Sequence, residues 1–417
     1  MLEFRLGGDD IFLPAIGVFQ VPPERSIEPL GALLLALVMV MSLAACGGKA
    51  AKTDGYKVAM VTDYGDITDQ SFNQTTWEAC VQFGKDNNVE VKYYKPTSND
   101  TAGRVASVEL AIAEGYNVIV MPGYAFGGTI AEVSGEYPDV KFIALDVSKG
   151  DLLEGGVALK GESYDYNPDN WNLTDYVHMD NVYCAIYQEE LCGYMAGYAA
   201  VKLGYTKLGF LGGMAVPAVV RYGYGYVQGV DAAAKELGIT VDMKYAYGNQ
   251  FFGDADITAV MDTWYADGTE IVFACGGGIY SSAAEAAKKV GGKVIGVDVD
   301  QSGIIDGDYG EGMTVTSAMK GLAPATIDTL VDVVVNGNWD KYAGKIDTLG
   351  LVSGDDASKN YVQIPVATTQ FEDGKFTADD YAALVKAMFD GSLVVSNDIT
   401  AEPAVTNVNV SYLGNLK

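Results

Sequence analysis

The sequence contains only one histidine, His178, and this limits the chemistry that the chain can perform. Serine and cysteine hydrolases of the triad type need a histidine beside the nucleophile, and no nucleophile-elbow pattern is present either. The five cysteines form no CxxC pair and have no neighbouring histidine, so their spacing gives no indication of a metal site. Apolar flanks predict buried free thiols, without a structural disulfide, at Cys80, Cys184, Cys192 and Cys275.

Basic residues are also scarce. Lys and Arg together number 27 against 55 Asp and Glu, which gives a net charge of −28. The negative electrostatic potential of such a chain repels phosphate backbones and anionic membrane surfaces. The composition therefore excludes nucleic acid as a partner and favours a neutral or cationic one. The glycine run that begins at Gly276 has neither a GxGxxG pattern nor a P-loop lysine, and it therefore indicates close backbone approach rather than phosphate binding.

Long apolar runs are absent except over residues 30–45. This run is shorter than the roughly 20 residues that a transmembrane helix needs, and it ends in small residues as a signal peptide does. The sequence Leu43-Ala44-Ala45-Cys46 resembles the bacterial lipobox, which implies a lipidated Cys46 on the outer face of the cytoplasmic membrane. We therefore expect a leader over 1–45 and a flexible tether over 46–55. Residues 1–29 do not resemble a normal signal-peptide start, which suggests a misassigned start codon.

From residue 56 the sequence alternates short β-branched runs with longer helical patterns, as βαβ units of a parallel sheet do. We expect strands over 57–62, 90–94, 117–121 and 141–145, with helices over 72–87, 106–114 and 129–137. A Gly-, Asp- and Asn-containing stretch at 161–180 follows. Strands are then expected over 181–187, 207–211, 240–245, 271–274 and 294–297, with helices over 190–202, 219–236, 255–266 and 281–289. The two similar sets predict two doubly wound α/β lobes.

Aspartates end several of the predicted strands. In open α/β sheets the ligand lies at the carboxyl ends of the strands, so we expect Asp63, Asp146 and Asp298 to face a cleft between the two lobes. An aspartate after a strand can instead cap the next helix, and we expect this for Asp66 and Asp69. Aromatic residues that could line the same cleft are Phe72, Tyr124, Phe126, Tyr247, Phe251 and Phe252.

Some of these residues belong to motifs. Val61-Thr62-Asp63, followed by Asp69-Gln70-Ser71-Phe72-Asn73-Gln74, resembles the opening signature of the basic membrane protein family of substrate-binding lipoproteins, which includes nucleoside-binding proteins of ABC importers. Segments 137–142, 212–214, 295–298 and 316–320 also occur in that family's order and approximate spacing. The likeness extends over about 57–335.

The resemblance implies a type I periplasmic-binding-protein fold, in which three crossing segments join two lobes. The first lobe is then expected over 56–178 plus 300–337, and the second over 179–299 plus 338–417. It also implies a monomer without catalytic activity or cofactor. Such a protein captures purine nucleosides and delivers them to an ABC permease with its ATPase subunits.

Carried over residue by residue, the resemblance implies ligand contacts at Asp63, Phe72, Asn73, Asp146, Asp298 and Lys320, with Phe251 or Phe252 as a second aromatic. Gly276 is expected at the same site because its backbone can approach the ligand closely. The two aromatics would stack on the base, Asn73 and Asp63 would bind its polar edge, and Asp298 and Asp146 would hold the ribose. Lys320 would either donate to a ring acceptor or balance the carboxylates.

Alternatives remain open at this point. Sugar- and furanone-binding proteins of the same fold also use aromatics and carboxylates, so composition does not separate them from nucleoside receptors. Paired carboxylates could also hydrolyse a glycosidic bond, as in a nucleoside hydrolase. A surface antigen or sensor without transport partners is a third possibility. The sequence departs from the family at the long stretch 148–180 and at Arg221-Tyr222, where an Arg-Phe is usual.

Overall fold

The structure, a computed structural model, describes residues 53–417. The predicted leader, the lipidation site Cys46 and most of the 46–55 tether lie outside the described residues. Lys52–Lys417 forms one compact unit. Within 53–417, no helix combines the length and apolar character needed to cross a membrane.

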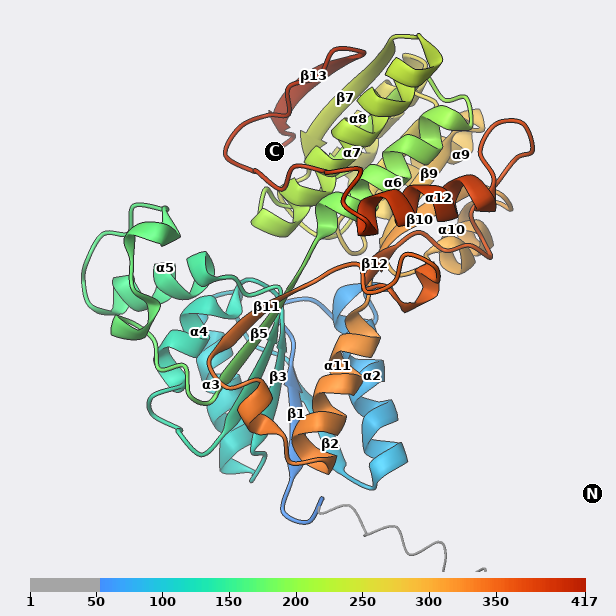
Figure 1. Cartoon of the computed structure of the whole chain (residues 1–417). Coiled ribbons are helices and arrows are strands. Elements are labelled where there is room, and N and C mark those ends of the chain that lie inside the picture. The colour runs from blue at the N-terminus through green and yellow to red at the C-terminus, as the bar shows by residue number, and fades with distance from the viewer. Residues whose placement is uncertain (1–52) are drawn as a thin grey trace, which may run out of the picture. The chain divides into compact units, whose positions relative to one another are not determined.

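Two sheets organise this unit, one in each of two lobes (Figure 1). The first sheet has six strands in the order β11-β5-β4-β3-β1-β2, and the second has seven in the order β12-β10-β9-β8-β6-β7-β13. Neighbouring strands are parallel, except that β12 runs antiparallel to β10. The predicted α/β fold with two doubly wound lobes is confirmed.

The first lobe contains these helices and strands: β1 (Lys57–Val61), α2 (Phe72–Asn87), β2 (Glu90–Tyr94), α3 (Thr101–Ala113), β3 (Val118–Pro122), α4 (Phe126–Val133), β4 (Lys141–Leu145), α5 (Lys149–Leu159), β5 (Val182–Tyr187), α11 (Leu322–Leu330) and β11 (Lys345–Leu349). The second lobe contains α6 (Glu189–Lys202), β6 (Lys207–Gly212), α7 (Pro217–Leu237), β7 (Val241–Tyr247), α8 (Ala255–Ala266), β8 (Ile271–Cys275), α9 (Tyr280–Val290), β9 (Lys293–Asp298), α10 (Ser302–Tyr309), β10 (Thr314–Lys320), β12 (Val362–Gln363), α12 (Ala378–Phe389) and β13 (Val408–Asn415).

The lobe boundaries expected from the sequence need correction. Strand β5 lies in the first sheet, where Phe142 pairs with Val182, whereas we expected it to open the second lobe. Strand β10 lies in the second sheet, although 300–337 was assigned to the first lobe, and β11 returns to the first sheet from the segment assigned to the second. The alternation of strands and helices shows that a strand exists but does not specify the sheet in which it pairs. The chain crosses between lobes after β5, after β10 and after β11 (Figure 1).

The C-terminal segment returns to the far edge of the second sheet. Strand β13 pairs parallel to β7, with Val408 opposite Val241, and the pairing shifts in register between Tyr412 and Asn415. The Asp231 carboxylate on α7 accepts hydrogen bonds from the backbone N–H groups of Thr406 and Asn407 at 2.8 and 2.6 Å. These bonds fix the start of β13 against the lobe.

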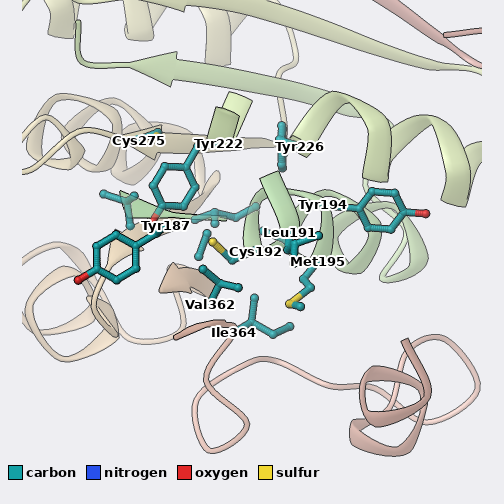
Figure 2. Close-up of a cluster of buried hydrophobic side chains, with 14 of the residues drawn as sticks. Tyr187, Leu191, Cys192, Tyr194, Met195, Tyr222, Tyr226, Cys275, Val362 and Ile364 are labelled. Atoms are coloured by element: carbon teal, nitrogen blue, oxygen red, sulfur yellow. The ribbon is translucent and has the colours of Figure 1, made fainter. Parts of the chain in front are cut away.

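The core of the second lobe depends on close packing between α6 and α7. Figure 2 shows Leu191, Cys192, Tyr194 and Met195 of α6 with Tyr222 and Tyr226 of α7 in a cluster of buried side chains. Glycines on the two helices make the close approach possible. A Cβ added at Gly193 would lie 2.2 Å from the Tyr222 carbonyl oxygen, and one added at Gly225 would lie 2.1 Å from that of Glu190.

The four predicted thiols Cys80, Cys184, Cys192 and Cys275 are buried and free, as expected. Burial raises the pKa of the Cys80 thiol to about 12, because the thiolate would lose its hydration. A thiol in this state is a small apolar side chain rather than a nucleophile.

The α6–α7 contact can be tested with a glycine replacement. We expect Gly225→Ala to lower the free energy of unfolding by roughly 1–3 kcal/mol, because the methyl group overlaps the Glu190 backbone and the helices must separate. Gly307→Ala in α10 is the matched control. No atom lies within 4 Å of its added Cβ, so we expect a neutral or stabilising effect of up to about 1 kcal/mol. Urea denaturation measures both, and equal stabilities of the two variants would contradict the proposed packing constraint.

Candidate ligand-binding site

A cavity of about 380 Å³ lies between the two lobes, at the carboxyl ends of both sets of parallel strands. Its volume is within the range of about 300–1,000 Å³ that is usual for small-molecule sites. All nine residues predicted as ligand contacts line this cavity: Asp63, Phe72, Asn73, Asp146, Phe251, Phe252, Gly276, Asp298 and Lys320. The structure thus brings together residues that are up to 257 positions apart in the chain.

Asp63 and Asn73 form one corner of the cavity. The Asp63 Oδ1 atom accepts hydrogen bonds from the backbone N–H groups of Tyr64 at 2.6 Å and Gly65 at 2.7 Å, and from the Asn73 side-chain amide at 3.2 Å. Burial raises the pKa of Asp63 even though these bonds favour its charged form. The Asn73 Oδ1 atom is buried and has no hydrogen-bond partner among the described residues, so it is open to a donor from a ligand.

Asp69 holds the start of α2 in place. Its two carboxylate oxygens accept from the backbone N–H groups of Ser71, Asn73 and Gln74 at 2.9–3.1 Å, and from the Asn73 side chain at 3.0 Å. It therefore satisfies the free amides of the first turn, as predicted. The same prediction is wrong for Asp66, whose carboxylate instead pairs with Lys95 at 2.8 Å near the surface.

Lys320 is at the centre of a buried charge cluster. Its ammonium group contacts the carboxylate of Asp146 in the first lobe, and lies 3.4 Å from Glu189 Oε1 and 3.8 Å from Asp298 Oδ1 in the second lobe. Arg221 Nε donates to the other Glu189 oxygen at 2.6 Å. These two cations face three carboxylates, so one negative charge remains in excess.

This excess charge affects the ionisation of the cluster. Burial, opposed by the Lys320 ammonium, raises the pKa of Asp146, and burial also raises that of Asp298. Lys320 itself has a raised pKa because its carboxylate partners outweigh the cost of burying the ammonium. The Asp146 Oδ1 atom is buried without a hydrogen-bond partner among the described residues. A ligand hydroxyl that donates to Asp146 would therefore satisfy a group that is costly to leave alone.

Asp146 and Asp298 share an uncommon backbone conformation. Asp146 directly follows β4 and Asp298 is the last residue of β9, and their φ angles are +60° and +65°. This left-handed region is costly for most side chains but is tolerated by Asp and Asn. The conformation turns the chain sharply at the strand end, and both carboxylates line the cavity.

Aromatic rings from both lobes line the cavity. The Phe72 ring centroid lies 4.8 Å from Lys320 Nζ, and the Phe251 centroid lies 6.4 Å from that of Tyr64. The Phe251 ring lies against Gly213, where an added Cβ would approach it to 2.4 Å. Phe252 also touches the cavity but is 55% exposed. Tyr124 lines the cavity, whereas Phe126 is fully buried in the core of the first lobe, and Tyr247 packs against the core of the second.

Several cavity residues were not among the predicted ligand contacts. Arg221 and Tyr222 at the start of α7 line the site, and the Tyr222 hydroxyl donates to Asp298 Oδ1 at 3.3 Å. The apolar run 216–219 and the pair Ser148 and Asp151 at the start of α5 complete the wall. For Arg221 and Tyr222, the sequence gave one signal: this pair stands where the family usually has Arg-Phe. Glu189, which belongs to the charge cluster but does not line the cavity, gave no sequence signal, because its role depends on where β5 crosses into α6.

The buried carboxyl group of Glu190 should make the free energy of unfolding depend on pH. Burial and the neighbouring Glu189 raise the pKa of Glu190 from 4.5 to about 7. The folded protein therefore keeps this proton while the unfolded chain loses it, and the free energy of unfolding should fall as pH rises from about 4.5 to about 7. Glu190→Gln should flatten this decline and raise the stability above pH 7 by roughly 1–3 kcal/mol. Urea denaturation at a series of pH values measures the effect, and parallel profiles for the variant and the unchanged chain would contradict it.

The chain is similar to known solute-binding proteins in both sequence and fold. A nucleoside-binding protein of an ABC transporter from Lactococcus lactis, BmpA, is 29% identical over 64% of this chain and 72% of its own length. Basic membrane protein B from Borreliella burgdorferi is 26% identical over 76% of this chain and 84% of its own length. Among solved structures, a solute-binding protein of an ABC transporter system from Aeropyrum pernix covers 82% of this chain and 88% of its own, with 19% identity and a TM-score of 0.59. One from Conexibacter woesei covers 82% of this chain and 99% of its own, with 20% identity and a TM-score of 0.58.

The two solved structures support the fold, and the family match extends this to the role of the chain. Residues 56–355 match the Bmp family, described as ABC transporter substrate-binding protein, PnrA-like. The matched range includes the cavity from Asp63 to Lys320 and leaves out most of the C-terminal segment. The chain therefore belongs to the Bmp family of ABC transporter substrate-binding proteins.

Proposed function

We propose that the chain binds purine nucleosides in the interlobe cavity and delivers them to an ABC permease. The observation that carries this proposal is the combination, in one cavity, of aromatic rings from both lobes with two buried acceptors that have no partner among the described residues, the Asp146 carboxylate and the Asn73 amide. A nucleoside needs both, because it joins a flat base to a neutral sugar with adjacent hydroxyls. The name of the Lactococcus lactis relative agrees with this choice of ligand.

The base would stack between Phe72 and Phe251. Stacking on two rings buries a large apolar area and suits a planar ligand. Phe251 is the better second partner because its ring is held against Gly213, whereas Phe252 is largely exposed. Asp63 and Asn73 would bind the polar edge of the base, with the free Asn73 Oδ1 accepting from a ring or exocyclic N–H group.

The ribose would lie near Asp146 and Asp298. Hydrogen bonds from sugar hydroxyls to carboxylates are stronger than those between neutral groups, and Asp146 Oδ1 is free to accept one. Lys320 already contacts three carboxylates, so its role in this proposal is to balance their charge rather than to bind the base. Gly276 allows the backbone to approach closely, since an added Cβ would lie 2.8 Å from Gly213 Cα.

Delivery would follow closure of the two lobes around the ligand. A ligand that contacts both lobes stabilises the closed form, and that form would dock on the permease, whose ATPase subunits drive transport. Lipidation of Cys46 would hold the protein at the outer face of the membrane, and a relative from Pyrococcus abyssi is named a lipoprotein. Several acyl chains would give stable anchoring where one alone binds marginally. We expect a monomer without cofactor or nucleic-acid partner, and no catalysis.

Calorimetry on residues 47–417, after unfolding and refolding to remove carried-over ligand, tests the ligand class. We expect binding of guanosine, inosine or adenosine, and weaker binding of uridine, ribose and free bases. Phe72→Ala and Phe251→Ala should each weaken binding by roughly 10- to 100-fold, because stacking area is lost. Phe252→Ala is the matched control and should change affinity by less than about threefold, because that ring is mostly exposed.

The carboxylates need variants that keep the backbone intact. Asn tolerates the left-handed conformation, so Asp146→Asn and Asp298→Asn test charge without adding strain. If calorimetry detects binding of a sugar but of no nucleoside, the ligand assignment is wrong, although the fold assignment stands. Release of free base from a bound nucleoside, followed by chromatography, would instead indicate a hydrolase.

A further inference from the structure

The serine at the start of α2 does not cap its own helix. Ser71 occupies the N-cap position, where serine normally accepts a hydrogen bond from the first-turn backbone, yet its side chain makes no such bond. The neighbouring Asp69 accepts from those amides instead. The Ser71 hydroxyl is therefore available for another partner.

That partner lies in the other lobe. The Ser71 Oγ atom donates to Asp298 Oδ2 at 2.6 Å, between two residues that are 0% and 6% exposed. A hydrogen bond to a buried carboxylate is among the stronger kinds in proteins. It joins the start of α2 in the first lobe to the end of β9 in the second.

A second hydrogen bond lies directly beside the first. The Gln301 side-chain amide donates to the Gln70 carbonyl oxygen at 3.2 Å, and Gln301 is 1% exposed. The orientation of this amide is fixed, because its oxygen accepts from the Val297 N–H group at 2.9 Å. Gln70 presents its carbonyl from a left-handed backbone with a φ of +56°.

Each half of this contact is held within its own lobe. The Ser71 N–H group donates to Asp69 at 2.9 Å, and the Gln70 N–H group donates to Gln74 at 3.0 Å. In the second lobe, Tyr222 donates to Asp298, and Gln301 also donates to the Gly277 carbonyl at 3.4 Å. Opening the cleft would therefore break the two interlobe bonds and leave their supports intact, so little ordering is needed when the lobes close again.

We propose that Ser71 and Gln301 form an interlobe clasp that stabilises the closed cleft and slows the release of ligand. The clasp acts through lobe closure rather than through direct recognition of the ligand, and Ser71 and Gln301 are not among the residues that line the cavity. The part of this inference that concerns ligand release rests on the proposed nucleoside function. The effect on closure does not.

Stopped-flow kinetics with a bound purine nucleoside tests the effect on release. We expect Ser71→Ala to raise the dissociation rate about tenfold while the association rate changes by less than about threefold, since the bond forms only after the lobes meet. Thr377→Ala is the matched control, because Thr377 caps α12 with its own hydroxyl, far along the chain from the cavity. It should lower the melting temperature without changing either rate. A Ser71→Ala variant with unchanged release would overturn the proposal.

Energy transfer between dyes on the two lobes tests closure without any ligand. Cysteines introduced at the exposed positions Glu132 on α4 and Lys235 on α7 can be labelled, because the four native cysteines in 53–417 are buried. We expect both Ser71→Ala and Gln301→Glu to shift the unliganded population away from the closed distance. In Gln301→Glu an oxygen can still accept from Val297, while the second oxygen faces the Gln70 carbonyl and repels it.

The two readouts separate the possible failures. Loss of the closed population in both variants, with no nucleoside bound by the unchanged chain, would support the clasp and overturn the ligand assignment. Unchanged distances in both folded variants, as judged by circular dichroism, would overturn the clasp whatever the ligand. If Ser71→Ala fails to fold, Gln301→Glu alone decides, because it leaves the start of α2 untouched.

Discussion

The contact of Lys320 with carboxylates from both lobes is the interaction on which the rest of the site depends. An ammonium group this deeply buried is stable only if several acceptors surround it, and here they come from Asp146, Glu189 and Asp298. Their positions require β10 to lie beside β9, β5 to cross into α6, and two strands to end in left-handed turns. The charge cluster thus links the two lobes, and Asp146, Asp298 and Lys320 of this cluster also line the cavity.

The two lobes repeat one arrangement. The order β5-β4-β3-β1-β2 in the first sheet corresponds to β10-β9-β8-β6-β7 in the second. Asp146 and Asp298 lie at the carboxyl ends of equivalent strands, β4 and β9, and have nearly the same φ. A cleft formed by two such edges presents similar groups from both sides, so a ligand between them can be held by both lobes at once.

The sequence was sufficient to predict most elements and a set of residues that line one cavity. Helices such as Phe72–Asn87 and Ala255–Ala266 agree with the expected bounds because their patterns and end signals are local. The assignment of β5, β10 and β11 to lobes failed because pairing between strands depends on contacts far apart in the chain. Ser71 illustrates the same limit at one residue. A serine before a helix often caps it, but here Asp69 accepts from the first-turn amides and the Ser71 hydroxyl donates to Asp298 of the other lobe, a contact that the sequence alone does not indicate.

Strand β13 changes the exposed edge of the second sheet. Without it, β7 would present a row of unpaired backbone groups flanked by tyrosines, and such an edge can pair with a neighbouring chain. β13 replaces it with a strand that carries Asn409, Ser411 and Asn415 and is interrupted by a register shift and by Gly414 at a φ of +68°. An irregular polar edge is a poor template for further strand addition. The C-terminal segment would thereby protect the second lobe from edge-to-edge aggregation.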